Sequence, residues 1–211
     1  MKRTAFWVLA AAGGLLMTAS CQQFTNTIRD TFNPAEGPTA ADAEGTYLPR
    51  RPRRTVDFLK DAGRLGAAQQ KLRALPAFAG KTIYLCQHVH FYDDGRIMAR
   101  LQHPENPEYA DQYNYEGGEW TGPVPVQLSV SENIAEHRVP LDSVQFATIA
   151  TIYRNYTQKA DSIQGAMPFT HAYMIIRNRN FQWYPQHISG SREIYYISFR
   201  HDGAVDRFYR K

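Results

Sequence analysis

Residues 84–102 read YLCQHVHFYDDGRIMARLQ, two runs of alternating apolar and polar residues separated by Asp-Asp-Gly at 93–95. An alternation with a period of two indicates β-strands that bury one face, and Asp-Asp-Gly is typical of the turn between paired strands. Successive side chains of a strand point to opposite faces, so Leu85, Val89 and Phe91 share one face. The stretch therefore predicts a β-hairpin whose aliphatic face packs against the core.

The length of the turn decides which side chains meet across this hairpin. A two-residue loop at 94–95 would place Cys86 opposite His103, and with His88 these would form a cluster of metal-binding residue types. A three-residue loop with Gly95 in the left-handed conformation would disperse that cluster and collect the aliphatic residues on one face. The pairs would then be Phe91 with Ile97, Val89 with Ala99, and Gln87 with Leu101. Because burial of one face fixes strand register, we predict the three-residue loop and no metal site.

In the predicted register, one face of the hairpin combines aromatic rings, imidazoles and a guanidinium. Such a mixture suits a binding surface, because aromatic and arginine side chains are enriched in protein interfaces. A plain solvent-facing side of a sheet is the alternative interpretation. The candidate binding face consists of Tyr84, His88, His90, Tyr92 and Arg100.

Two further segments have the apolar spacing of helices. Residues 55–75 carry a helical pattern that glycine weakens in the middle, so we predict a helix broken near Gly66. Residues 141–160 form a stronger helical pattern, with Asp142 or Ser143 as its N-terminal cap. Alternating runs rich in aromatic and β-branched residues predict strands at 82–91, 96–102, 111–116, 124–130, 171–177, 181–184, 193–199 and 204–209.

These elements form a helix followed by four strands, twice, and the same spacing separates Gly95 from Asn180 and Gly118 from Gly203. Duplication of one unit is one interpretation, and coincidental spacing is the other. In either case, hairpins joined to single helices predict an α+β fold, with a largely antiparallel sheet of about eight strands and two helices. The layout resembles, at the level of fold alone, the β-lactamase-inhibitor-like and PepSY-like periplasmic domains, which implies nothing about function.

A second turn of the same type is predicted near the C-terminus. The loop 201–203 ends in glycine and would place Phe199 beside Val205 and Tyr195 beside Tyr209.

The chain begins MKRTAFWVLAAAGGLLMTASC, with basic residues, an apolar run and small residues before Cys21. This pattern is typical of a secretory signal peptide and is too short for a permanent transmembrane helix. The ending MTASC resembles the lipobox of bacterial lipoproteins, which implies removal of residues 1–20 and lipidation of Cys21 on its sulfur and its new amine. Several acyl chains would anchor the protein stably in a membrane. Ordinary cleavage that leaves Cys21 as a thiol is the alternative.

The resemblance also bears on location, since Gln22 is not the aspartate that retains some lipoproteins in the inner membrane. It therefore implies an outer-membrane anchor that faces the periplasm. Residues 21–54 contain scattered prolines and glycines without an apolar period, which predicts a flexible linker. A single domain at 55–211 would follow, with enough residues for one core.

The cysteine and charge counts argue against an internal disulfide and against binding of nucleic acid. The chain has two cysteines, so a lipidated Cys21 leaves Cys86 without a disulfide partner. Loss of Lys2 and Arg3 with the signal peptide would leave 22 basic against 20 acidic residues, a balance that does not favour nucleic-acid binding.

Sequence motifs of catalysis are absent: there is no nucleophile elbow, zinc-protease helix motif, phosphate-binding loop or dinucleotide fingerprint. Glu116 and Glu119 flank glycines and are interpreted as turn residues rather than an acid-base pair. We therefore expect a lipid-anchored cell-envelope protein without enzymatic activity or cofactor, acting as a binding or assembly factor for another envelope protein or a peptide. Binding of a metal or small ligand by the first hairpin is one alternative, and hydrolysis of cell-wall or glycan material is another.

Overall fold

A computed structural model describes residues 57–211 of the chain. The predicted signal peptide, Cys21 and the predicted linker lie outside the described residues. The helices are α2 (Ala62–Arg73) and α3 (Thr148–Ala160), with short 3₁₀ segments η1 (Phe58–Lys60), η2 (Pro76–Phe78) and η3 (Leu141–Ser143). The strands are β1 (Tyr84–Tyr92), β2 (Ile97–Gln102), β3 (Ala110–Glu116), β4 (Glu119–Pro125), β5 (Arg138–Pro140), β6 (His171–Arg177), β7 (Asn180–Tyr184), β8 (His187–Ser189), β9 (Ile194–Phe199) and β10 (Val205–Arg210).

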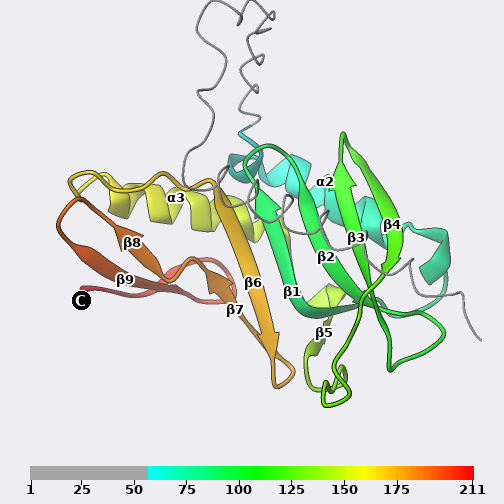
Figure 1. The fold of residues 1–211 in the computed structure, drawn as a ribbon. Coiled ribbons are helices and arrows are strands. Elements are labelled where there is room, and N and C mark those ends of the chain that lie inside the picture. The colour runs from blue at the N-terminus through cyan, green and yellow to red at the C-terminus, as the bar shows by residue number, and fades with distance from the viewer. Residues whose placement is uncertain (1–56) are drawn as a thin grey trace, which may run out of the picture. The chain divides into compact units, whose positions relative to one another are not determined.

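The strands form two antiparallel sheets (Figure 1). The larger sheet has the order β4-β3-β2-β1-β6-β7, and β5 pairs with the beginning of β1. The smaller sheet has the order β10-β9-β8. The predicted α+β class with a largely antiparallel sheet and two helices is therefore confirmed.

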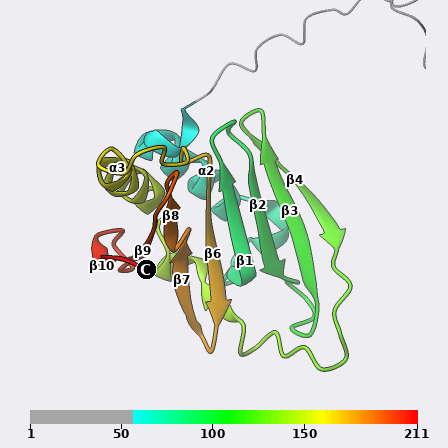
Figure 2. The same ribbon diagram turned by 60° about the vertical axis from the view of Figure 1, so that its left-hand side comes forward.

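Both α-helices lie against the same face of the larger sheet (Figure 2). The buried side of α2 includes Leu65 and Leu72, and that of α3 includes Ile149 and Ile152. They pack against the aliphatic face of the sheet in one core, and each such side chain contributes about 1.5–3 kcal/mol by leaving water. Neither helix in residues 57–211 is long and apolar enough to cross a bilayer.

The first hairpin has the predicted three-residue turn. The Tyr92 amide donates to the Arg96 carbonyl, and Gly95 has a φ of 97°, in the left-handed region. Phe91 pairs with Ile97 and Val89 with Ala99, as predicted. In the C-terminal hairpin, the predicted pairing of Phe199 with Val205 is also confirmed.

Two predicted pairings are wrong because a strand is irregular between the turn and the pair. Leu101 lies opposite Leu85 rather than Gln87, since β1 bulges between Leu85 and Val89. Gln87 adopts a φ of 56°, which the sequence does not signal because non-glycine residues rarely occupy this region. In the last hairpin, an irregularity after Val205 places Tyr209 opposite Tyr196 instead of Tyr195.

The helix boundaries also differ from the prediction. The break in the first segment falls at Asp61, whose carboxylate accepts the Arg64 amide as an N-cap, and α2 continues through Gly66. The second segment starts as η3, and α3 begins only at Thr148, so neither Asp142 nor Ser143 caps it. Among the strands, the segment predicted at 124–130 is wrong, since β4 spans 119–125, and the short β5 and β8 were not predicted.

The strand order brings the first strands of the two predicted halves together. β1 and β6 pair at the centre of the larger sheet, β2 to β4 extend to one edge, and β7 extends to the other. The second half then departs from the first, because β8, β9 and β10 form a separate sheet. Duplication of a helix-and-four-strand unit thus stays a prediction.

Gln69 joins the two helical segments through a buried set of hydrogen bonds. Its Nε2 donates to the carbonyls of Val144 (2.7 Å) and Leu141 (3.3 Å), and its Oε1 accepts from the amide of Phe146 (2.9 Å). The side chain is 4% exposed, so water cannot replace these partners. A polar residue inside α2 therefore fixes the path of the chain into α3.

Replacing Gln69 by leucine should destabilise the domain by about 2–4 kcal/mol, because the Val144 carbonyl and the Phe146 amide would lose their buried partners. Urea denaturation of the full-length chain measures this loss. Gln70→Leu is the matched control, since Gln70 follows Gln69 on the same helix and is exposed. Equal stability of the two variants would contradict the role assigned to Gln69.

Candidate functional site

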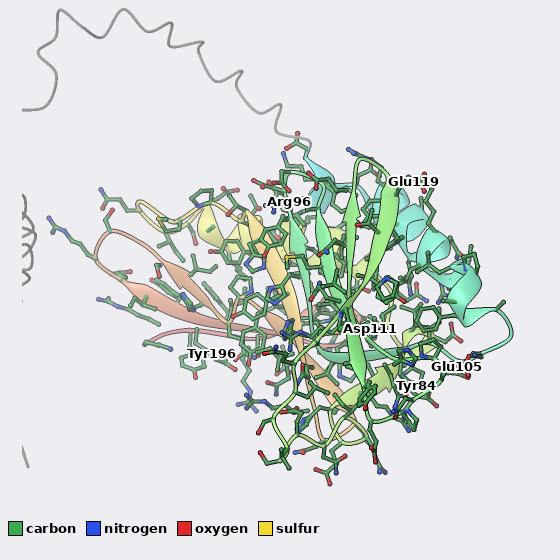
Figure 3. All side chains as sticks on the ribbon, turned by 45° about the vertical axis from the view of Figure 1, so that its right-hand side comes forward. Tyr84, Arg96, Glu105, Asp111, Glu119 and Tyr196 are labelled. Carbon is green, nitrogen blue, oxygen red and sulfur yellow. The ribbon has the colours of Figure 1, made fainter. Side chains whose placement is uncertain are left out.

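The candidate site lies on the face of the larger sheet opposite the helices. Because Leu85, Val89 and Phe91 point to the core, the alternate positions of β1 face away from it. All five residues of the predicted binding face lie on this side and are half-buried. Figure 3 shows Arg96 at the turn end of β1 and β2, and Tyr84 at the opposite end. We call this side of the sheet the open face.

Cross-strand pairing lines up rings on the open face. Tyr92 lies opposite His171, His90 opposite Tyr173, and Tyr173 opposite Tyr184. The ring centroids of these pairs are 4.5, 5.4 and 4.7 Å apart, with planes inclined by only 8°, 17° and 12°. Stacked pairs of this kind stabilise neighbouring strands and hold their rings rigid. We call these five side chains, on β1, β6 and β7, the aromatic stripe.

The start of β1 is covered on this side by the connection between β4 and β5, residues 126–137. The Gln87 amide donates to the His137 carbonyl at 2.8 Å, which attaches the connection to the bulge of β1. Beneath it, Cys86 packs with Ala110 and Ile134 in a small apolar cluster. Burial raises the pKa of the Cys86 thiol to about 12, so this cysteine is not a reactive thiolate at neutral pH.

A pocket of about 600 Å³ lies between the aromatic stripe and this connection. Its wall includes His88 and Arg100 from the first hairpin, and it also includes His90 and Tyr173 of the stripe. Glu132 and His137 come from the connection, and Arg177 from the end of β6.

Arg100 lies in this pocket, and no carboxylate of the described residues forms an ion pair with it. Its Nη1 donates to Oε1 of Gln87, whose Nε2 in turn donates to Glu132 at 2.8 Å. Nε of Arg100 is buried and has no hydrogen-bond partner among residues 57–211. None of the ion pairs within residues 57–211 includes Arg100, whereas Arg96, between β1 and β2, contacts Asp94 at 2.8 Å.

The histidines beside Arg100 are held in the neutral form. Burial is the main cause that lowers the pKa of His90 to about 4, followed by repulsion from the protonated forms of His88 and His171 and from Arg100. Burial and Arg100 also lower the pKa of His88, and burial lowers that of His171. Nδ1 of His90 lies 3.0 Å from Nε2 of His171, a hydrogen bond in which one nitrogen carries the proton and the other accepts it.

The structure does not bring together the candidate metal ligands Cys86, His88 and His103. Cys86 is enclosed in its apolar cluster, and Nδ1 of His103 accepts the amides of Glu105 and Asn106 beyond the end of β2. Within residues 57–211 no three His, Cys, Asp or Glu side chains form a group that could hold a metal ion. The positive charge of Arg100 would in addition disfavour a cation near His88.

The residues interpreted as turn formers lie in turns of the described chain, and two tryptophans pack in or beside the core. Glu116 and Glu119 pair across a two-residue turn of glycines, and Asp94 accepts the amide of Arg96 in the first turn. Trp183 is buried in the core, and Nε1 of the half-buried Trp120 donates to the carbonyl of Ala68.

Sequence reasoning missed the part of the site that comes from the second half of the chain. The alternation in HAYMIIR at 171–177 does signal that His171 and Tyr173 share a face. It does not signal that this strand pairs with β1, because such pairing joins residues far apart in sequence. Glu132 and His137 lie in an irregular connection that has no periodic signal at all.

Comparison of the chain with protein-family models, with curated proteins and with solved structures gave no match in any of the three.

The neutral histidines predict that the domain is less stable in acid. Between pH 6.5 and about 4 the unfolded chain would bind protons that His90 does not bind when folded, so the free energy of unfolding should fall as the pH falls. Urea midpoints of the full-length chain across this range measure the effect. The fall should be smaller for His90→Gln than for His187→Gln, which alters an exposed histidine on β8. An NMR titration that protonates His90 at pH 6.5 would contradict the assignment.

Proposed function

We propose that this protein is a lipid-anchored component of the cell envelope that binds another envelope protein or a peptide on the open face of its larger sheet, without catalysing a reaction. The observation that carries the proposal is the aromatic stripe, five stacked rings on the face that the helices leave uncovered. The lipobox-like MTASC at 17–21 supports the anchor, and Gln22 supports the outer membrane facing the periplasm.

The stripe is suited to binding for two physical reasons. Its rings are already ordered by cross-strand stacking, so they lose little conformational freedom when a partner binds. Each ring also combines apolar carbon with a polar atom, a composition that favours contact with the mixed surface of a protein or peptide. Arg96 extends this surface, since its guanidinium lies 4.7 Å from the centre of the Tyr92 ring.

Binding of a small ligand is the second candidate function. The pocket of about 600 Å³ beside Arg100 has the size of a small-molecule site. A small ligand in this pocket would contact the same guanidinium and imidazoles as a peptide, so the two candidate functions share one site.

The anchor is tested by replacing Cys21 with serine. The serine chain cannot receive the acyl groups, so it should no longer incorporate labelled palmitate and should leave the membrane fraction of the cell envelope. Fractionation of the envelope, followed by immunoblotting, measures this change. Cys86→Ser is the matched control and should stay with the membrane. Retention of the Cys21 variant in membranes would contradict the lipid anchor.

The binding surface is tested by photo-crosslinking in intact cells. Gln182 on β7 is exposed and lies opposite Ile175, so a photoreactive residue there should capture a specific partner. Gln158 on α3 is an exposed glutamine on the helical side and serves as the control, which should capture nothing specific. Mass spectrometry of the adducts identifies the partner. Adducts of the same kind and yield at both positions would count against the open face as the binding surface.

A further inference from the structure

The pocket at Arg100 has the chemistry of an anion site. We propose that it binds the carboxylate of an acidic residue in a peptide segment, while the adjoining aromatic stripe contacts the residues on either side of that carboxylate. This inference rests on the proposed function and specifies the chemistry of the partner.

The charge of the pocket supports an anion. Its wall carries the guanidiniums of Arg100 and Arg177 and one carboxylate, that of Glu132. That carboxylate accepts from Gln87 and forms no ion pair with Arg100. A half-buried guanidinium with an unsatisfied Nε is costly to keep in a folded protein unless a ligand compensates its charge.

The side chain of Arg100 is oriented before any ligand binds. Gln87 connects Nη1 of Arg100 to the carboxylate of Glu132 by two successive hydrogen bonds. Gln87 itself occupies the bulge of β1 with a positive φ, a conformation that non-glycine residues adopt at a cost. Strain of this kind is retained at binding sites because it positions a functional group, here the planar fork of donors of Arg100.

The groups around Arg100 favour a carboxylate over a cation or a neutral group. The neutral imidazole of His88 carries one N–H that can donate to an anion, and His90 offers its Nε2–H when His171 is the donor in the hydrogen bond between them. Neither imidazole adds a charge that would require a second anion. One guanidinium plane matches the two oxygens of a carboxylate.

The position of the pocket favours a peptide as the source of the carboxylate. His90 and Tyr173 belong both to the pocket wall and to the aromatic stripe. A ligand whose carboxylate lies at Arg100 therefore has rings directly beside it, and the half-buried Ile175 provides an apolar contact on the same strand. An acidic residue flanked by aromatic residues would satisfy all three environments at once.

The test uses the full-length chain in detergent micelles and three probes: acetyl-Phe-Glu-Phe-amide, its glutamine counterpart acetyl-Phe-Gln-Phe-amide, and inorganic phosphate. Binding is followed by the NMR signal of the Arg100 Nε–H, which the structure leaves free of a hydrogen bond. The glutamate peptide should bind about ten-fold more tightly than the glutamine peptide, because only the former gives a charged hydrogen bond to the guanidinium. Phosphate should bind more weakly than the glutamate peptide.

Variants separate recognition from folding. Arg100→Gln should abolish the preference for the glutamate peptide, so that the two peptides bind with equal affinity. The thermal midpoint of this variant should equal or exceed that of the unmodified chain, since the substitution removes a charge that no carboxylate in the described part of the chain pairs with. Arg73→Gln is the matched control, because Arg73 contacts Asp142 on the helical side of the sheet, and it should preserve the preference.

Three results would overturn the inference: equal affinity for the two peptides, tighter binding of phosphate than of the glutamate peptide, or no binding of the glutamate peptide up to about 1 mM. Each of these leaves the proposed function standing if crosslinking from Gln182 still captures a partner. Failure of the crosslinking together with selective glutamate binding would instead overturn the protein partner and retain the anion site.

Discussion

Strand β1 is hydrogen-bonded along both edges, and the arrangement of the domain depends on this. One edge pairs with β2, and the other pairs first with β5 and then with β6. Both α-helices of the described residues lie on one side of the sheet, so a strand in its middle packs against helices on that face alone. The aliphatic side of β1 therefore faces α2 and α3, and its histidines and tyrosines are left on the open face.

The bulge at Gln87 lies where β1 changes partners. Cys86 pairs with Arg138 on β5, whereas His88 pairs with Ile175 on β6. The bulge between Leu85 and Val89 leaves the side chains of Leu85 and Val89 on the core side. It therefore changes the path of the strand without changing its buried face. It also places the Gln87 side chain where it can hold Arg100. The irregularity that permits the fold is thus the one that orients the candidate site.

The parts of the fold that the sequence predicts are those determined by local alternation. The three-residue turn at 93–95 follows from the requirement that Phe91 meet Ile97, and the structure confirms it. The bulge could not be predicted, since Gln87 is neither glycine nor asparagine and no local pattern indicates a positive φ there. The candidate site was predicted only where local alternation determines it. The residues on β1 and β2 were identified. His171 and Tyr173 were not, because the pairing of β1 with β6 joins residues far apart in the sequence.

The aromatic stripe and the pocket are physically coupled through His90. The charge of Arg100 is one of the causes that lower the pKa of His90 and of His88, so an anion that neutralises this charge would raise the pKa of both imidazoles. Linkage is reciprocal, and protonation of His90 would therefore strengthen binding of the anion. Protonation would also impose a direction on the hydrogen bond with His171, because a protonated His90 can only donate across that 3.0 Å contact. The same electrostatic contacts on the open face would then govern three things: binding of a ligand carboxylate, protonation of His90 and the order of the stacked rings.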